Sequence, residues 1–501
     1  MSEINPYQSP KSSDLAAERI RFAGGKDRSV LLAEGKIPRL VLMFSLPAVI
    51  GMLAQAMYYL VDRAYIGHGM GESGIAGVTI AFPAMLVLLA CGMLIGLGAA
   101  ALVSIRMGQK RKADAEAVLG NAVVLLVGMA ALLTVGGLLG LDYIVRCFGA
   151  IDIDSAVFHN ARDYLQIIVA GAGFQVIGFG LNAIIRGEGN PRVAMYTLLI
   201  GVLLNCGLAP IFIFGLHWGM RGAALATVIS QAVSATWAVW HFLSGNSVLT
   251  LHLRNLRLRP PVCAAIMAVG SPQFLMQMAA GMMNVILNNQ LRIYGGDVAI
   301  ATWGAVYIVG MMVALPIIGI NQGVQPIIGF NYGAEKFDRV KKALQIGVLA
   351  ATSIVVFGFL IAMLIPGPLI RLFGCHSEEM VTLGTHAMRI SLLMLPLVGF
   401  QILSASYFQA VGKPREAMFL MLSRQILLLI PAVWLLPRFF AYMHLLPLDG
   451  VWAALPTADL CSSILTGVCF FREIRHLQRR HTENRLEGSP ALVAVPSGGG
   501  D

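Results

Sequence analysis

An aspartate inside the first long apolar segment is the residue best suited to do chemistry in this chain. Asp62 lies in the run Y-Y-L-V-D-R-A-Y-I-G-H, and Gln55 precedes it by seven residues. On a helix this spacing brings the two side chains to within about 20° of the same face. A carboxylate in a low dielectric can exchange a proton near neutral pH, because burial disfavours its charged form. An ionisable group within a membrane helix is costly and marks a functional site by default.

Polar side chains recur in the other apolar segments of the N-terminal half. Gln175 and Asn182 repeat the seven-residue spacing. We expect the set to line one polar cavity with Asp62. The alternative is that these groups only bond neighbouring helices, which is worth about 0.6–2 kcal/mol each. The set is Gln55, Tyr59, Gln175, Asn182, Asn205 and Thr227.

The C-terminal half carries its own candidates for substrate contact. Four amides of segment 262–294 fall within about 60° of one another on a helix. Two methionines of that segment either line an adaptable apolar pocket or simply pack between helices. One glutamine lies in the Gly- and Pro-rich stretch 316–333, where a weakened helix can leave carbonyls facing a cavity. An arginine and an aspartate predict either a buried ion pair or a substrate-contacting or gating pair. These residues are Gln273, Gln277, Asn284, Asn288, Met276, Met283, Gln325, Arg424 and Asp459.

The amino-acid composition indicates that membrane-spanning helices position these side chains. The chain has 501 residues, of which 57% are apolar and 12% charged, and its mean hydropathy is +0.75. Soluble domains carry about 25% charged residues, so an ordinary soluble protein is excluded, and so is a disordered one. The apolar blocks are long enough to cross about 30 Å of hydrocarbon as helices. About twelve spans are predicted, over 39–66, 73–104, 117–140, 160–186, 193–215, 221–243, 262–294, 298–330, 343–366, 384–410, 417–437 and 448–471.

The distribution of charge predicts the orientation in the membrane. The net charge is +10, which in a soluble protein would suggest nucleic-acid binding. Here 27 of the 36 Lys and Arg residues fall in the two tails and in alternate connections between spans. Basic residues concentrate on the cytoplasmic side of membrane proteins. We therefore expect both termini inside, a multi-pass protein of a bacterial inner membrane, and no nucleic-acid partner.

The two halves of the sequence repeat. G-N-P-R-V-A-M at Gly189 to Met195 aligns with G-K-P-R-E-A-M at Gly412 to Met418, and three other blocks align at offsets between 223 and 226. Six spans per half make the repeat parallel, an arrangement common in transporters with the substrate between the halves. The predicted organisation is a cytoplasmic tail (1–38), a six-helix bundle (39–245), a cytoplasmic linker (246–261), a second six-helix bundle (262–471) and a cytoplasmic tail (472–501).

Several motifs of other protein classes are absent from the sequence. There is no G-x-x-x-x-G-K-[ST] phosphate-binding loop, no H-E-x-x-H and no G-x-S-x-G. The seven cysteines show no C-x-x-C spacing, which argues against a zinc site or a disulfide framework. We expect no enzyme activity, no cofactor and no resident metal.

The ordered motifs resemble the MATE (multidrug and toxic compound extrusion) transporters over roughly residues 35–475, and in particular their DinF- and MepA-like bacterial branch. The matching motifs are V-D-R-A-Y-I-G-H at Val61 to His68, R-G-E-G-N-P-R at Arg186 to Arg192, Q-G-V-Q-P-I-I-G-F-N-Y-G-A at Gln322 to Ala334, and S-R-Q-I-L-L-L-I-P at Ser423 to Pro431. The resemblance implies an all-α fold of two six-helix bundles that form a V.

The resemblance also implies a function. The family's coupling aspartate corresponds to Asp62, and its surrounding network corresponds to Gln55, Asn182, Asn205 and Thr227. The family branch often has a second carboxylate where this chain has Ala209. Hard cations prefer anionic oxygens, so the expected coupling ion is H⁺ rather than Na⁺.

We therefore expect export of amphipathic or cationic drugs and toxic compounds by a monomer embedded in membrane lipid. Two alternatives are a flippase for lipid-linked precursors or polysaccharides of the same superfamily, and a scaffold or sensor that transports nothing.

Overall fold

The computed structural model describes residues 26–148, 155–372 and 377–487. Residues 1–25 and 488–501 of the two expected tails lie outside this part of the chain. The described part contains helices and no strand. Its helices are α2 (Lys26–Glu34), α3 (Ile37–Gly108), α4 (Lys112–Leu139), α5 (Leu141–Cys147), α6 (Ala156–Ala170), α7 (Ala172–Gly187), α8 (Pro191–Pro210), η1 (Ile211–Gly215), α9 (Gly219–Leu243), η2 (Leu253–Leu256), α10 (Pro260–Gly333), α11 (Phe337–Leu364), α12 (Pro366–Leu372), α13 (Glu378–Ser391), α14 (Leu395–Ala410), α15 (Pro414–Leu422), η3 (Ser423–Leu429), α16 (Ile430–Tyr442) and α17 (Pro447–Glu487).

The helices account for the predicted twelve spans. Helix α3 has 72 residues and α10 has 74, which as straight helices would measure about 110 Å, more than three times the hydrocarbon thickness. Each is broken by a glycine with positive φ, Gly71 and Gly296, and each therefore forms two spans. Helices α6 and α7 are bent by 54°, and α13 and α14 by 48°, so each pair forms one broken span. Counting broken pairs as one span and divided helices as two gives twelve.

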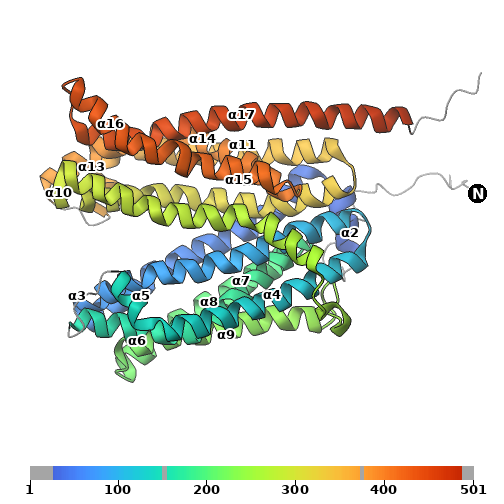
Figure 1. Cartoon of the computed structure of the whole chain (residues 1–501), viewed down its shortest axis with the longest axis horizontal. Coiled ribbons are helices and arrows are strands. Elements are labelled where there is room, and N and C mark those ends of the chain that lie inside the picture. The colour runs from blue at the N-terminus through green and yellow to red at the C-terminus, as the bar shows by residue number, and fades with distance from the viewer. Residues whose placement is uncertain (1–25, 149–154, 373–376, 488–501) are drawn as a thin grey trace, which may run out of the picture.

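The backbone supports the parallel repeat seen in the sequence. Gly71 and Gly296 are 225 residues apart, as are Lys110 and Glu335, which also have positive φ. Helices α4 and α11 both have 28 residues. In Figure 1 the N-terminal half, blue to green, forms one lobe, and the C-terminal half, yellow to red, forms the other. Helix α2 and the end of α17 lie at the same end of the molecule (Figure 1), as an even number of spans requires. We call this the α2 end.

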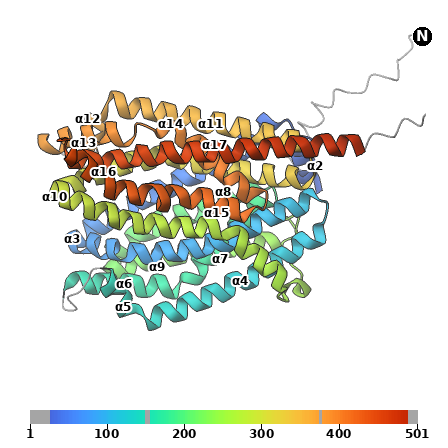
Figure 2. The same cartoon turned by 45° about the horizontal axis from the view of Figure 1, so that its top comes forward.

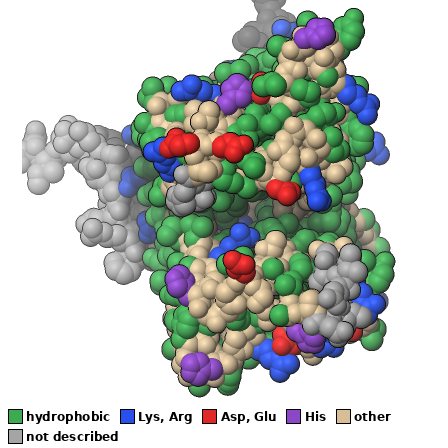
Figure 3. All heavy atoms as spheres, turned by 90° about the vertical axis from the view of Figure 1, so that its left-hand side faces the viewer, with side chains coloured by type: hydrophobic (Ala, Val, Ile, Leu, Met, Phe, Trp, Pro, Cys, Tyr) green, Lys and Arg blue, Asp and Glu red, His purple; other side chains and the backbone are tan. Residues whose placement is uncertain are grey.

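The two lobes meet through α3 and α10, which run side by side in Figures 1 and 2. Glycines permit this contact at the α2 end. A Cβ on Gly270 would lie 1.6 Å from the Leu94 carbonyl oxygen, and one on Gly98 would lie 2.1 Å from the carbonyl oxygen of Ile266. We call this contact the seam. Figure 3 looks onto the opposite end and shows a hollow between the lobes, so the lobes are closed at the α2 end and apart at the other.

Candidate coupling site and substrate cavity

A cavity of about 120 Å³, open on one side, lies within the N-terminal lobe between α3, α7, α8 and α9. Its wall combines aromatic side chains with amides and hydroxyls. Pockets for small molecules are typically apolar with a few convergent polar groups, and this wall has that character. The lining residues are Gln55, Tyr58, Tyr59, Met85, Leu89, Phe174, Gln175, Gly178, Phe179, Asn182, Thr197, Leu198, Gly201, Val202, Asn205, Thr227, Ser230, Gln231 and Ser234.

The structure brings six of the predicted residues together at this cavity, namely Gln55, Tyr59, Gln175, Asn182, Asn205 and Thr227. Residues three, four and seven apart on a helix share a face, which explains why α3 presents its polar groups to one space. Thr227 on α9 joins two elements. Its Oγ1 lies 3.3 Å from the Tyr58 hydroxyl of α3 and accepts a hydrogen bond of 3.1 Å from Asn205 Nδ2 of α8.

Asp62 is buried beside this cavity, with 5% of its surface exposed, and is not among the described residues that line it. It lies one helical turn beyond Tyr58 on α3. It is close enough to Tyr58, Tyr164 and Cys206 for a charge on its carboxyl group to interact with these side chains. Its Oδ1 is buried and has no hydrogen-bond partner among the described residues. A buried charged oxygen without a donor is costly, so binding of a proton or a cation at Asp62 would stabilise this arrangement. The neighbouring Arg63 is exposed and lies 6.0 Å from the centre of the Phe82 ring.

Asn182 is engaged at both ends of its amide. Its Nδ2 donates to the Ala194 carbonyl oxygen at 2.7 Å, and its Oδ1 accepts a hydrogen bond from Nη1 of Arg186, one turn further along α7. The guanidinium therefore uses one lone pair of this oxygen and places a positive charge beside it. Among the described residues, no group of three or more His, Cys, Asp or Glu side chains could hold a metal ion.

The predicted residues of the C-terminal half do not line this cavity. Met283 is buried in the core of the C-terminal lobe, and Met276 packs against that core. Gln325 donates a hydrogen bond of 3.2 Å to Gln409 Oε1. The others, Gln273, Gln277, Asn284 and Asn288, lie along the first half of α10, where the first two are half-buried and the last two are exposed. Their contact with substrate stays a prediction.

Arg424 and Asp459 form the ion pair that the sequence offered as one of two alternatives. Arg424 Nε lies 2.5 Å from Asp459 Oδ1, and the side chains are 30% and 8% exposed. Arg424 belongs to the π-helical turn η3, a rare geometry that often occurs at functional sites. The pair joins η3 to α17 inside the C-terminal lobe.

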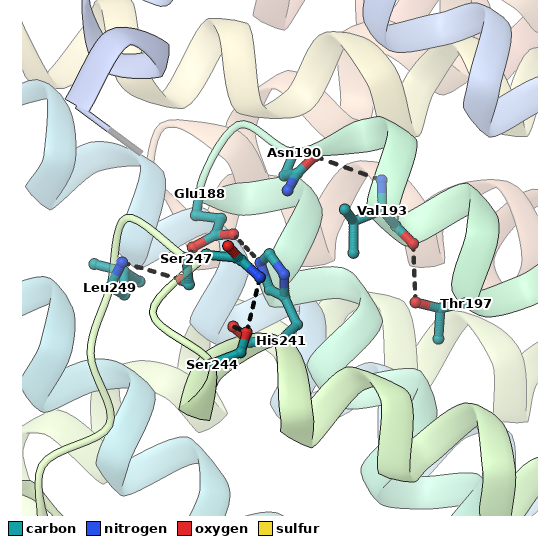
Figure 4. Close-up of polar contacts among 9 residues, drawn as sticks. Glu188, Asn190, Val193, Thr197, His241, Ser244, Ser247 and Leu249 are labelled. Carbon is teal, nitrogen blue, oxygen red and sulfur yellow. Dashed lines mark hydrogen bonds and ion pairs between the residues drawn. The ribbon is translucent and has the colours of Figure 1, made fainter. Parts of the chain in front are cut away.

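The loop R-G-E-G-N-P-R forms a second buried polar cluster between α7 and α8 (Figure 4). Glu188 Oε1 lies 2.6 Å from His241 Nε2, and Ser247 donates to Glu188 Oε2. Asn190 caps α8 by accepting a hydrogen bond from the Val193 amide at 3.4 Å. The cluster fixes the direction in which α8 leaves α7, and these two helices carry Asn205 and Asn182 to the cavity.

Comparison with known proteins assigns the family. Residues 47–211 and 272–435 match the MatE family, once in each half of the chain. The chain belongs to the MatE family of transporters. It is 27% identical to the multidrug export protein MepA of Staphylococcus haemolyticus over 430 residues, which cover 86% of this chain and 92% of that protein. It is also 27% identical to MepA of Staphylococcus aureus strain MSSA476 over 420 residues, covering 84% and 90%.

Solved structures of MATE transporters share the fold. A transporter of the MOP superfamily from Pyrococcus furiosus is 25% identical, with a TM-score of 0.83 over 90% of this chain and 98% of that one. An outward-facing MATE transporter of the same superfamily is 24% identical, with a TM-score of 0.84 over 90% and 99%. The chain is therefore a multi-pass membrane transporter of the MATE fold and not an enzyme, as predicted.

The sequence interpretation missed several residues of the cavity wall. Tyr58, Ser230, Gln231 and Ser234 all line it. Tyr58 adjoins Tyr59 and lies one turn before Asp62, so helical spacing alone could have identified it. The α9 residues lie three, four and seven positions after Thr227, the spacing of one helical face, and carried the same signal.

Proposed function

We propose that this protein exports amphipathic, cationic small molecules in exchange for protons that bind Asp62. The observation that carries the proposal is a buried carboxyl group with an unpartnered oxygen beside an aromatic and polar cavity. The names of the MepA relatives as multidrug export proteins support the substrate class. A cavity with a mixed aromatic and polar wall suits varied ligands, because aromatic contacts depend little on hydrogen-bonding pattern.

The surroundings of Asp62 favour H⁺ over Na⁺. A sodium site needs several oxygen ligands, preferably anionic ones. Asn182 Oδ1 already accepts a hydrogen bond from a guanidinium, and Ala209, where the family branch often has a second carboxylate, is a fully buried alanine. A proton needs no such shell and by itself neutralises Asp62.

The charge distribution supports an orientation of the protein in the membrane. The positive-inside rule places the α2 end in the cytoplasm, so the closed seam faces inward and the hollow of Figure 3 faces outward. In this outward-open state a proton from outside binds Asp62, the region around Tyr58 and Thr227 repacks, and the substrate is released. The lobes then rock about the seam and reload from the cytoplasm.

A flippase for lipid-linked precursors is less well supported. Such a transporter needs cationic side chains to hold a pyrophosphate, and the described residues that line the cavity include no Lys or Arg. A scaffold or sensor is less well supported still, since it needs no polar cavity.

Reconstitution in liposomes tests the proposal. A fluorescent lipophilic cation is followed under a pH gradient, and separately under a Na⁺ gradient. We expect transport driven by the pH gradient, and at least a ten-fold loss in Asp62→Asn. Asp297→Asn is the matched control, since Asp297 is exposed beside the glycine break of α10. Normal transport by Asp62→Asn, or transport driven by Na⁺ alone, would contradict the mechanism. Movement of a lipid-linked pyrophosphate but not of the cation would favour the flippase.

A further inference from the structure

Arg186 is a buried cation whose charge is not matched by a neighbouring carboxylate. It is 5% exposed, and its Nη1 donates to Asn182 Oδ1. Its Nη2 is buried without a hydrogen-bond partner among the described residues. The ion pairs of the described residues do not include Arg186.

The nearest acidic residue in sequence is already engaged. Figure 4 shows Glu188 turned toward His241 and Ser247, with Oε1 at 2.6 Å from His241 Nε2 and Oε2 accepting from Ser247. The carboxylate of Glu188 therefore contacts His241 and Ser247, on the side of the loop that faces the linker. The guanidinium of Arg186 depends on neutral groups for its hydrogen bonds, and one of its nitrogens still needs an acceptor.

An orphaned acceptor from the other lobe faces the same space. Arg186 of α7 and Gln322 of α10 both line a small cavity in the seam, together with Ser104 of α3. Gln322 is 9% exposed, and its Oε1 is buried without a hydrogen-bond partner among the described residues. Ser104 donates to Gly187 O at 2.8 Å, so its hydroxyl hydrogen is used elsewhere. The cavity has room for about one water molecule.

We propose that Arg186 Nη2 and Gln322 Oε1 bind one water molecule that bridges the two lobes, and that Arg186 thereby connects Asn182 to the closed seam. Water accepts from the guanidinium and donates to the amide oxygen, so it satisfies both orphaned atoms. An anion has no hydrogen to give Gln322. The water site stands on geometry alone, whereas the connection to Asn182 as a coupling residue rests on the proposed function.

The water site predicts how Arg186 and Gln322 each shift the equilibrium between a closed and an open seam. In the closed seam Arg186 has one direct and one water-mediated partner, and when the seam opens bulk water hydrates it fully. Replacing Arg186 by an apolar residue therefore favours the closed seam, because no desolvated charge remains. Replacing Gln322 leaves Arg186 in the closed seam with a poorly held water, which favours opening. Mere damage to packing would move both variants in the same direction.

Distances between spin labels at Gln109→Cys and Lys342→Cys, both exposed at the α2 end, report the state of the seam. The full-length protein is used without substrate, with its native cysteines replaced. We expect Arg186→Met to reduce the population with long distances at least three-fold, and Gln322→Met to raise it at least three-fold. The double variant should resemble Arg186→Met. Shifts of the same sign in both single variants, or none, would overturn the proposal.

A high-resolution structure tests the ligand directly. We expect one density peak at hydrogen-bonding distance from both Arg186 Nη2 and Gln322 Oε1, about 2.7–3.2 Å, and none there in Gln322→Met. An anomalous peak after bromide soaking, or a direct contact between the two side chains, would overturn the assignment. Neither experiment measures transport or uses Asp62, so the proposed function and the water site can fail independently.

Discussion

The two lobes share one fold but differ in how their interiors are built. In the N-terminal lobe the buried apolar residues form two main clusters, one around Ile66 and Phe158 and one around Leu126 and Val176. The main buried cluster of the C-terminal lobe is a single one that runs through its helices. The repeat offset of 225 that pairs Gly71 with Gly296 pairs Asp62 with Leu287, which is 4% exposed in that cluster. A duplicated scaffold therefore carries a polar cavity in one copy and an apolar core in the other.

The lobes are more alike at the connection between their fourth and fifth spans. In the N-terminal lobe the loop is held to α9 by Glu188 and His241, at 2.6 Å. In the C-terminal lobe Lys413 lies 2.7 Å from Glu473 of α17. Both lobes keep a contact between this loop and their last helix, although the acidic residue lies on the loop in one lobe and on the helix in the other. We therefore assign both pairs a structural role and not a role in coupling.

Exchanging the residue types at the paired positions Asp62 and Leu287 should produce the largest effect. Leu287→Asp places an unpaired carboxyl in the continuous core and should lower the free energy of unfolding by at least about 3 kcal/mol. Asp62→Leu should leave the stability unchanged or higher, because it removes an orphaned buried group, while abolishing transport driven by a pH gradient. Thermal unfolding in detergent and liposome transport measure the two effects. Equal destabilisation by both variants would contradict the contrast between the lobes.

Breaking the ion pair of the C-terminal lobe should have the next largest effect. Asp459→Ala leaves Arg424 partly buried and unpaired, which should cost about 1–3 kcal/mol of stability, less than for a fully buried pair because Arg424 is 30% exposed. The double variant Arg424→Met/Asp459→Leu should recover most of this stability and keep transport. A stable double variant that transports poorly would instead assign the pair to substrate contact.

Two glycines of α10, Gly270 in the seam and Gly281 outside it, allow the same substitution to be compared within one helix. A Cβ on Gly270 meets the Leu94 carbonyl oxygen, whereas one on Gly281 of the same helix meets nothing within 4 Å. Gly270→Ala should force the lobes apart at the α2 end and reduce transport about ten-fold, a change of about 1.4 kcal/mol. Gly281→Ala should be neutral or slightly stabilising, by about 0.5–1 kcal/mol. Spin-label distances and transport rates distinguish them, and similar rates in the two variants would show that the seam tolerates separation.

Filling the cavity should have the smallest effect. Met85 lines the cavity, so Met85→Trp should raise the KM for a bulky cation several-fold and change the KM for a small one less. Met276 packs against the core of the C-terminal lobe, so Met276→Trp should change stability more than KM. The reverse pattern would move the substrate site toward the C-terminal lobe.

Sequence reasoning predicted the architecture well because its signals are strong and local. Apolar length, basic connections and the internal repeat together predicted twelve spans in two bundles. Helical spacing also predicted that Gln175 and Asn182 share one face of α7, and both line the cavity. The same spacing paired Gln55 with Asp62, but only Gln55 lines the cavity, while Asp62 is buried beside it. Spacing did not decide whether Met283 lines a pocket or packs in the core, because an apolar residue at helical spacing looks alike in both places; the structure places it in the core of the C-terminal lobe.

Other features depend on contacts between distant segments and could not be read from spacing. The contact between the Thr227 hydroxyl of α9 and the Tyr58 hydroxyl of α3 joins residues 169 positions apart. The contact of Arg186 with Asn182, by contrast, lies within one turn of α7, so helical spacing could have identified it. The approach of Gln322 to the seam cavity that Arg186 lines depends on how the lobes meet, and the seam is built from glycines of α3 and α10 at the α2 end. No pattern within one helix contains that information.

In the proposed mechanism, Asp62 carries the proton that is exchanged for substrate. Protons released into weakly buffered detergent solution on addition of a lipophilic cation measure this directly, with wild type, Asp62→Asn and Asp297→Asn compared at equal occupancy. We expect close to one proton per bound cation for wild type and Asp297→Asn, and none for Asp62→Asn. Equal proton release by Asp62→Asn at unchanged affinity would contradict it.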